Sequence, residues 1–573
     1  YGSQTGSAQE VAERAGRQAK RFLLKTRVQS MDDYFVKSLP SETLVLYVCS
    51  TTGQGEEPDN MKHFWKFLLR KDLPAHSLAA QNFAVIGLGD SSYSKFNFAA
   101  KKLHRRLAQL GANPIMDPVY GDDQHELGPD FLIDPWLKTF WQQVLEHYPL
   151  PPGSQPLNED ILLPPKFKLV KTENGLASQE KEVPFMSTVL HNERVTDVNH
   201  FQDTRLITMD IRDSNLTYSP GDVAVMQPSN LPESVDKFFE VFPHLDSSEL
   251  FFIESSESSP APPRWLLPQP YTFRNCLEKY LDLQCVPRRY FFELLAKFSK
   301  DEMEKEKLEE FASSAGQQEL YSYCNRPKRT VLEVLADFYK SAEGVPLEYW
   351  FDLLTPIKPR SFSIASSFIA TPNELQILVA VVSYKTKMSS LRKGLCSTWL
   401  SSLQPGAKLH LKVRKGTLKF PPQMNTPVIM VGPGTGCAPF RAYISDQMTS
   451  KTNRKLVLFF GCRNKAKDFY FQEEWISLTN EGKLTLVTAF SRDQEDKIYV
   501  QHRIEEERKL LKKMILEEGA WIYVAGNAKQ MPDAVKSALQ TCLEDNHTFP
   551  REKAENYMKK LEAENRLQFE TWS

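Results

Sequence analysis

The stretch Lys358-Pro-Arg-Ser-Phe-Ser-Ile-Ala-Ser-Ser367 brings together side chains that could hold a dinucleotide. In an extended strand, Arg360 and Phe362 fall on one side, and Ser361 and Ser363 fall on the other. A guanidinium matches a pyrophosphate, an aromatic ring offers a flat apolar surface to a second ring system, and a hydroxyl can hydrogen-bond a ring nitrogen. These are the parts of a flavin dinucleotide site, although an ordinary basic strand edge would carry the same residue types.

The elements that position this stretch belong to a chain too long for one core. At 573 residues we expect roughly three or four domains. A net charge of −1 with 41% hydrophobic and 25% charged residues is typical of a globular protein and argues against a disordered chain or a broadly basic nucleic-acid binder. The eight cysteines form no CxxC pair, so neither a disulfide framework nor a zinc site is indicated. Without a recognisable signal peptide or long apolar run, we expect a cytoplasmic monomer with no metal site and no membrane segment.

Residues 1–148 alternate apolar strands, at 44–49 and 83–88, with helices at 61–70 and 98–110, which predicts a doubly wound α/β domain. Polar loops follow at 2–8, 50–55, 87–97 and 121–126, and loops at the carboxyl ends of such strands should line one site. No lysine follows Gly6, which favours a bound phosphate monoester over a nucleoside triphosphate, and Tyr93 could stack on a ring. A loop of this kind normally follows a buried strand, so we expect the natural chain to extend before Tyr1.

Residues 149–182 form a proline-rich linker, which is either a passive spacer or a semi-rigid hinge. Short strands at 206–211, 220–226 and 375–382 then predict an antiparallel barrel over residues 183–424. A helical insertion at about 232–350 interrupts it, with clear helices at 290–297 and 301–312. The turn from Gly394 to Ser397 leads into a helix N-terminus that could contact a pyrophosphate or simply carry a cap.

Residues 425–573 return to α/β alternation, with strands at 428–431, 455–460, 484–489 and 521–525, which predicts a Rossmann-like domain. A glycine-rich loop at 432–441 would let its backbone approach a ligand closely. The loop at 490–501 gathers two cations and two hydroxyls, which are Ser491, Arg492, Lys497 and Tyr499. This set suits a ribose 2′-phosphate, although a solvated charged loop could have the same composition. Trp572 could be a core anchor or a mobile lid over a ring.

The four loops of the first segment resemble the flavodoxin family, which binds FMN. The motifs around Arg360, at 394–397, at 432–436 and at 491–501, together with Trp572, resemble the ferredoxin–NADP reductase family. The whole chain is therefore similar to the diflavin reductases. The resemblance implies three parts: a flavodoxin-like doubly wound domain, an antiparallel FAD-binding barrel with a helical insertion, and a Rossmann-like NADPH-binding domain.

The resemblance also implies the residues of each site. Implied FMN contacts are Ser3, Gln4, Thr5, Gly6, Ser7, Ala8, Ser50, Thr51, Thr52, Gly53, Leu88, Gly89, Asp90, Ser91, Ser92, Tyr93, Ser94, Lys95, Phe96, Asn97 and Asp123. Implied FAD contacts are Lys328, Arg329, Arg360, Ser361, Phe362, Ser363, Gly394, Leu395, Cys396, Ser397 and Trp572. Implied NADP contacts are Gly434, Thr435, Gly436, Ser491, Arg492, Lys497, Ile498, Tyr499, Val500, Gln501 and Asp533. Implied catalytic residues are Ser363, Trp572 and Glu570.

The implied function is transfer of electrons from NADPH through FAD and FMN to a one-electron acceptor. The runs at 121–130, 134–136 and 431–441 most resemble one branch of these reductases. That branch donates electrons to cytosolic iron–sulfur cluster assembly, with the iron–sulfur protein anamorsin as partner. The sequence departs from the wider pattern at Thr52, Ala525 and Asn527, which bears on flavin potential and rate. A microsomal-type reductase for haem proteins, and a flavin-binding interaction protein with vestigial catalysis, remain alternatives.

One further expectation concerns the rim of the FMN site. Eight acidic residues occur in or just after its loops: Glu56, Glu57, Asp59, Asp122, Asp123, Glu126, Asp130 and Asp134. Any single one of them could instead cap a helix. As a set they would steer a partner that carries a basic patch.

Overall fold

The computed structural model describes residues 1–53, 55–93, 95–171, 183–254, 261–545 and 549–572. Ser94, one of the expected FMN contacts, and residues 172–182 of the linker therefore lie outside the described residues. The chain divides into two compact units. One comprises residues 1–180 and 230–357, and the other comprises residues 181–229 and 358–573.

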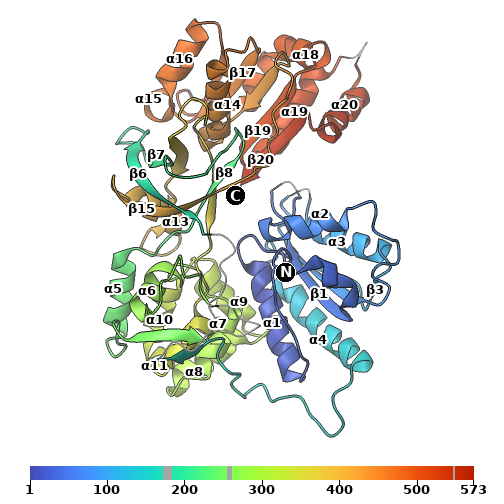
Figure 1. Cartoon of the computed structure of the whole chain (residues 1–573), viewed down its shortest axis with the longest axis vertical. Coiled ribbons are helices and arrows are strands. Elements are labelled where there is room, and N and C mark those ends of the chain that lie inside the picture. The colour runs from blue at the N-terminus through green and yellow to red at the C-terminus, as the bar shows by residue number, and fades with distance from the viewer. Residues whose placement is uncertain (54, 94, 172–182, 255–260, 546–548, 573) are drawn as a thin grey trace. The chain divides into compact units, whose positions relative to one another are not determined.

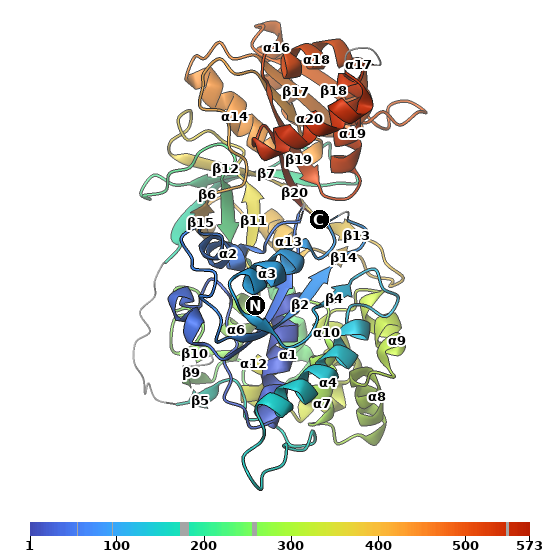
Figure 2. The same ribbon diagram turned by 90° about the vertical axis from the view of Figure 1, so that its right-hand side faces the viewer.

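The first unit begins with a parallel sheet in the order β1-β2-β3, in which β4 also pairs with β2. The strands are β1 (Leu44–Ser50), β2 (Asn82–Gly89), β3 (Asn113–Pro114) and β4 (Val119–Asp122). Gly2 adds a parallel bridge to Cys49. Buried side chains of α1 (Ser7–Arg21) and α4 (Asp130–His147) share one hydrophobic cluster with the sheet, and those of α2 (Lys62–Leu68) and α3 (Phe98–Gln109) share another. The predicted doubly wound arrangement is present, with helices on both faces (Figure 2).

The remainder of the first unit is mainly helical (Figure 1). Its helices are α5 (Pro232–Val241), α6 (Phe273–Lys279), α7 (Arg289–Ala296), α8 (Glu302–Ala312), α9 (Gln317–Leu320), α10 (Val331–Asp337), α11 (Tyr339–Glu343) and α12 (Trp350–Leu353). A small antiparallel sheet joins β5 (Lys168–Val170), β9 (Leu250–Glu254) and β10 (Tyr271–Thr272). Short helical turns are η1 (Val36–Ser41), η2 (Asp59–Met61), η3 (Tyr321–Asn325) and η4 (Leu347–Tyr349).

The second unit contains a six-stranded antiparallel sheet in the order β11-β8-β15-β6-β7-β12. Its strands are β6 (Phe185–Arg194), β7 (Thr204–Asp210), β8 (Val223–Met226), β11 (Arg360–Ser363), β12 (Glu374–Ala380) and β15 (Lys408–Arg414). The expected barrel is not closed among the described residues, because β11 and β12 are linked only by an isolated bridge between Ile364 and Ile377. The chain bends at Ser366, two residues after Ile364, and the pairing with β12 does not continue beyond this bend. The hairpin of β13 (Ser383–Tyr384) and β14 (Arg392–Lys393) then leads into α13 (Leu395–Ser402).

The second unit ends in a five-stranded parallel sheet in the order β18-β17-β16-β19-β20. The strands are β16 (Val428–Val431), β17 (Leu456–Cys462), β18 (Thr485–Phe490), β19 (Trp521–Asn527) and β20 (Leu567–Trp572). The turns η5 (Gly434–Cys437) and α15 (Lys465–Asp468) follow β16 and β17. On one face pack α14 (Ala438–Thr449) and α16 (Gln472–Asn480). On the other pack α17 (Val500–Glu506), α18 (Arg508–Leu516), α19 (Met531–Leu543) and α20 (Arg551–Ala563) (Figure 2).

The strand β20 was not anticipated, and it changes the interpretation of Trp572. This residue stands at the end of β20, opposite Asn527 of β19, and is 37% exposed. A side chain that anchors a core would be buried, so the exposure favours a surface role. Among the described residues, none of the helices combines the length and the apolar character that crossing a bilayer demands.

The helical part of the first unit depends on Trp350, which is fully buried against the rings of Phe238 and Phe242 at centroid distances of 5.2 and 5.4 Å. Trp350→Ala should destabilise it by about 3–5 kcal/mol, because the cavity cannot fully collapse. Hydrogen exchange of peptides from residues 230–357, followed at increasing urea concentrations, measures the free energy of unfolding of this part. The control is Met303→Ala, at a side chain 83% exposed, which should change stability by less than about 0.5 kcal/mol. Equal effects of the two substitutions would contradict the prediction.

Candidate functional site

The loops at the carboxyl edge of the first sheet are hydrogen-bonded to one another. Asn97, which starts α3, donates from Nδ2 to the carbonyl of Gly121 at 3.0 Å. The N–H of Ser91 donates to Asp122 Oδ1 at 2.9 Å, and the N–H of Ala99 donates to Thr51 Oγ1 at 3.2 Å. The structure therefore gathers the loops at 50–53, 88–97 and 121–124 at one edge, as the sequence predicted.

The first loop is shaped to present backbone N–H groups at the start of α1. Gly6 caps this helix in the left-handed region at φ 96°, a conformation that favours glycine. Its N–H donates to Ser3 Oγ at 3.0 Å, and the N–H of Ser3 donates to Asn60 Oδ1 at 2.7 Å. A helix N-terminus preceded by such a loop suits an anionic phosphate.

Two further residues test whether this edge fits a flavin mononucleotide. The Ser50 hydroxyl at the end of β1 is buried and has no hydrogen-bond partner among the described residues, which is expected where a polar ligand completes the site. The Asp123 side chain reaches the surface, yet partial burial of its carboxylate raises its pKa, an effect that Asp90 and Asp122 increase. The residues present therefore fit FMN.

The rim of this site is less negative than the sequence indicates, because several of its carboxylates are paired. Glu57 pairs with Lys102, and Asp59 pairs with Lys62 at 2.8 Å. Asp130 and Asp134 both bind Arg14, at 2.7 and 3.0 Å. Sequence reasoning missed these pairs because the lysines and arginines lie on helices α1, α2 and α3. The expected acidic face is thus partly neutralised.

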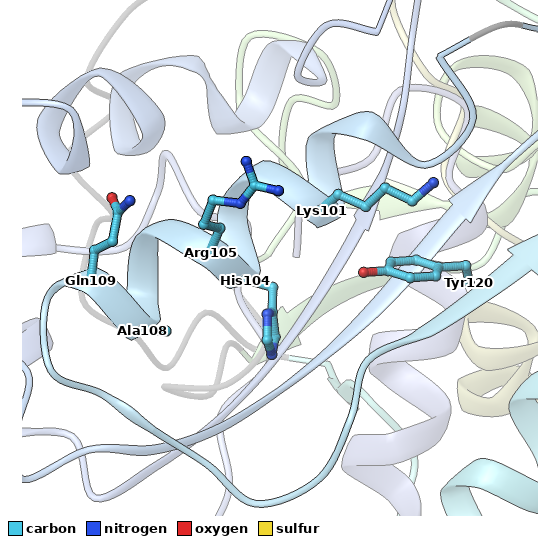
Figure 3. A pocket seen from close by; sticks show the side chains of 6 residues that line it. All are labelled: Lys101, His104, Arg105, Ala108, Gln109 and Tyr120. Carbon is cyan, nitrogen blue, oxygen red and sulfur yellow. The ribbon is translucent and has the colours of Figure 1, made fainter.

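A surface hollow on the same domain lies along α3 (Figure 3). It is lined by Lys101, His104, Arg105, Ala108, Gln109 and Tyr120. Lys101 Nζ donates to the carbonyl of Phe96 at 2.9 Å and lies 5.2 Å from the centroid of the Tyr120 ring. Burial lowers the pKa of His104. The hollow adds basic groups next to the flavin loops, which further reduces the acidic character of the domain.

In the second unit, the stretch from Arg360 forms strand β11 beside the start of α13. Burial raises the pKa of the Cys396 thiol in the first turn of α13 to about 12, and the charge of Arg360 opposes that shift. The Arg360 side chain is exposed, and Phe362 is partly buried. In the first turn of α13, Thr398 Oγ1 is buried without a hydrogen-bond partner among the described residues. A guanidinium and a helix N-terminus at one place suit a pyrophosphate, so these residues fit FAD.

The cap interpretation of the turn at 394–397 is not borne out, because Gly394 is the N-cap of α13 and no side chain caps this helix. Ser397 Oγ accepts from the N–H of Val382 at 3.0 Å and donates to the carbonyl of Gly394 at 3.4 Å. The Ser397 side chain therefore ties the helix start to the adjacent chain. The hydrogen-bond donors that this turn offers to an anion are therefore its backbone N–H groups and not the Ser397 hydroxyl.

The three predicted catalytic residues belong to β11 and β20. Ser363 Oγ donates to Glu570 Oε1 at 3.0 Å, although the two residues are 207 positions apart. On β20, Glu570 stands opposite Ala525, and Trp572 stands opposite Asn527. The structure thus joins Ser363 directly to Glu570 and places Trp572 two residues further along the same strand.

The glycine-rich loop after β16 packs tightly on the end of β19. A Cβ at Gly436 would lie 2.1 Å from the carbonyl oxygen of Ala525, so this position excludes other residues. Gly434 and Thr435 belong to the same turn. Val500 is buried at the start of α17, and Asp533 lies in the first turn of α19, so both occupy the carboxyl edge of the sheet.

The loop after β18 presents the cations that were expected to recognise a 2′-phosphate. Ser491 is buried, whereas Arg492, Lys497 and Tyr499 are exposed. Neither Arg492 nor Lys497 forms an ion pair within the part of the chain that the structure describes. Unpaired cations beside buried and exposed hydroxyls fit the phosphate of NADP.

One residue beside this loop was missed. Arg463 follows β17 directly, and its carbonyl accepts from the N–H of Arg492 at 2.8 Å. Its guanidinium lies 4.3 Å from the centroid of the Phe201 ring. The signal was available, because Arg463 occupies the carboxyl end of a predicted parallel strand, where ligands bind.

Lys328 and Arg329 are placed in the first unit. Arg329 pairs with Asp337 at 2.8 Å and lies 4.4 Å from the centroid of the Tyr323 ring. Lys328 has a positive φ of 54°, and its charge lowers the pKa of Asp123 against the effect of burial. A contact of either residue with FAD stays a prediction.

Comparisons with known proteins agree with this organisation. The flavodoxin family matches residues 1–136, the FAD binding domain family matches residues 177–399, and the oxidoreductase NAD-binding domain family matches residues 430–537. A Xenopus laevis protein named NADPH-dependent diflavin oxidoreductase 1 is 50% identical over 100% of this chain and 98% of its own length. Proteins of the same name from Mus musculus and Arabidopsis thaliana are 48% and 37% identical, again over 100% of this chain and 98% of their own lengths.

Gly436 gives a direct test of the nucleotide site. Gly436→Ala should weaken binding of NADP⁺ roughly tenfold or more, because the added methyl group must displace the loop from Ala525 at an overpacking cost of about 1–3 kcal/mol. Titration calorimetry with NADP⁺ measures the affinity. Gly482→Ala is the control for backbone strain away from the loop, since Gly482 has open space around it and only its φ of 69° disfavours alanine. Unchanged affinity in Gly436→Ala would show that the loop does not hold the nucleotide.

Proposed function

This chain belongs to the NADPH-dependent diflavin oxidoreductase family, and from that premise we propose that it carries electrons from NADPH through FAD and FMN to an iron–sulfur protein. The proposed acceptor is anamorsin, in cytosolic iron–sulfur cluster assembly, and the proposed location is the cytoplasm. The observation that carries the proposal is that one chain combines three nucleotide-binding loop sets with the Ser363–Glu570 pair. The electron route through two flavins follows from the family, and the proposed acceptor rests on the resemblance of the motifs at 121–130, 134–136 and 431–441.

Each cofactor, when bound, supplies redox chemistry that amino acids lack: FAD accepts a hydride and FMN passes single electrons. The side chains bind and orient. In the proposed arrangement, Arg360 and the start of α13 hold the pyrophosphate, and Phe362 provides a flat surface beside it. The Ser363 hydroxyl keeps a defined orientation because it donates to Glu570. Positioning of this kind accounts for much of the rate in reactions between stacked rings.

The second group of side chains selects the nicotinamide cofactor. Arg492 and Lys497 are exposed cations on the loop after β18, and Ser491 and Tyr499 add hydroxyls. A 2′-phosphate is the feature that distinguishes NADPH from NADH, so this loop is proposed to set the preference for NADPH. Trp572 is proposed as the movable cover of the FAD ring, in keeping with its exposure at the end of β20.

Replacing both Arg492 and Lys497 with Ala should raise the KM for NADPH by at least about tenfold, since charge-assisted hydrogen bonds contribute about 1.5–3 kcal/mol each. The KM for NADH should change little, because NADH lacks the phosphate. Steady-state reduction of ferricyanide with each cofactor measures both values. Lys483→Ala is the control, because this lysine pairs with Glu481 near the amino end of β18. An equal loss with both cofactors would mean that the two cations serve the fold.

The acceptor is tested by anaerobic stopped-flow spectroscopy. NADPH-reduced protein should bleach the iron–sulfur absorbance of oxidised anamorsin faster than it reduces a soluble cytochrome, and Glu570→Ala should slow the reaction by reducing hydride delivery. The Glu570→Ala variant should retain its flavins, because Glu570 acts on Ser363 and not on the phosphate groups. Reduction of the cytochrome with no reduction of anamorsin would contradict the proposed acceptor while leaving the diflavin activity intact.

A further inference from the structure

The phosphate loop of the FMN site is contacted by an arginine from the helical part of the first unit. Arg288 precedes α7 as its N-cap residue. Its Nη1 donates to the carbonyl of Gly6 at 2.6 Å, and its Nη2 donates to the carbonyl of Thr5 at 3.5 Å. Arg288 is 282 positions from Gly6 in the sequence, so the contact exists only through the tertiary structure.

Neighbouring residues hold Arg288 in this place. Arg289, the first residue of α7, pairs with Asp134 of α4 and donates from Nη2 to Ser314 Oγ at 3.1 Å. Arg17 of α1 lies 3.3 Å from the centroid of the Tyr290 ring. The start of α7 is therefore joined to α4 by an ion pair and to α1 by a cation–π contact, through the two residues that follow Arg288.

The contact fixes the peptide groups of the loop. In a trans peptide, the N–H points away from the C=O. An arginine bound to the Thr5 and Gly6 carbonyls therefore turns the N–H groups of Gly6 and Ser7 away from itself. The Gly6 N–H already donates to Ser3 Oγ, so the Ser7 N–H is left for a ligand at the start of α1.

The contact also brings charge to a loop that has none. Residues 2–8 include no charged side chain, whereas the phosphate of FMN is an anion. The charge of Arg288 reaches the flavin loops: with Lys328 it lowers the pKa of Asp123, against the larger effect of burial. Both cations belong to the helical part, so the FMN site receives positive charge from outside the flavodoxin-like fold in addition to the basic groups on α3.

We propose that Arg288 is a positioning residue for the phosphate of FMN, and that FMN binding and the packing of α7 against the phosphate loop strengthen each other. The proposal rests on the FMN site of the proposed function. Coupling of this kind is reciprocal: if the contact improves FMN affinity, then FMN stabilises the contact by the same factor. The flavodoxin-like half would thus bind its cofactor most tightly when it packs on the helical part.

The first test compares two flavins that differ only in the phosphate. Full-length protein depleted of FMN is titrated with FMN and with riboflavin, and binding is followed by quenching of flavin fluorescence. Arg288→Gln should weaken FMN binding about tenfold, a loss within the range for one charge-assisted hydrogen bond, and should change riboflavin binding by less than about twofold. Arg288→Lys, which keeps the charge and loses the fork, should give an intermediate FMN affinity.

Arg274→Gln is the matched control. Arg274 lies on α6 of the same helical part and pairs with Asp236 of α5 at 2.8 Å, so the substitution removes one positive charge without touching the loop. It should leave FMN binding unchanged. Equal weakening of FMN and riboflavin in Arg288→Gln, or no weakening of either, would overturn the inference. Wild-type protein that binds no FMN would overturn the proposed function instead.

Hydrogen exchange tests the reciprocal effect. FMN, but not riboflavin, should slow exchange of the α7 amides in wild-type protein, and Arg288→Gln should lose that protection. If FMN protects α7 equally in the wild type and in Arg288→Gln, the coupling does not pass through Arg288 and the inference fails. Protection confined to the flavin loops in wild-type protein would lead to the same conclusion.

Discussion

Phosphate groups must be held by backbone N–H groups and a few cations, and each cofactor site in this protein is built around that constraint. Helix N-termini supply the N–H groups: α1 begins after Gly6, α13 begins after Gly394, and the turn at Gly434 leads into α14. The carboxyl edges of the two parallel sheets gather the loops that precede α1 and α14, whereas α13 follows the antiparallel hairpin of β13 and β14. In the proposed sites, the fold places the anion-binding groups, and the side chains around them would decide which nucleotide binds.

The cations at these sites come from distant parts of the sequence. Arg360 lies on a strand that pairs with β8, whereas the helix start near it is α13. Arg288 lies in the helical insertion, yet it contacts the first loop of the chain. If these cations act as proposed, cofactor binding depends on the assembly of several elements. Loss of packing in the insertion would consequently be felt at the FMN site as well as in the helical core.

Charge pairing also determines how the FMN domain presents itself to a partner. Asp130 and Asp134 are engaged by Arg14, and Asp134 is also engaged by Arg289. Such carboxylates cannot attract a basic partner as isolated charges would. Glu126 remains exposed beside the loop, and burial raises the pKa of Asp123. Electrostatic steering would accordingly depend on a small number of residues next to the flavin edge.

The sequence by itself determined the order of the domains and most strands and loops that carry the sites. The strand at 428–431 and the loops around Asn97 and Ser491 were predictable, because apolar periodicity and glycine-bearing turns are local signals. The tertiary structure decided the features that depend on distant partners. These are the Ser363–Glu570 hydrogen bond, the pairing of β20 with β19 at Trp572, and the single bridge that leaves the barrel open between β11 and β12. It also decided the contact of Arg288 with Gly6. The physical reason is that a hydrogen bond or ion pair needs two groups within a few ångströms, and a sequence pattern specifies each group but not the separation that packing gives them.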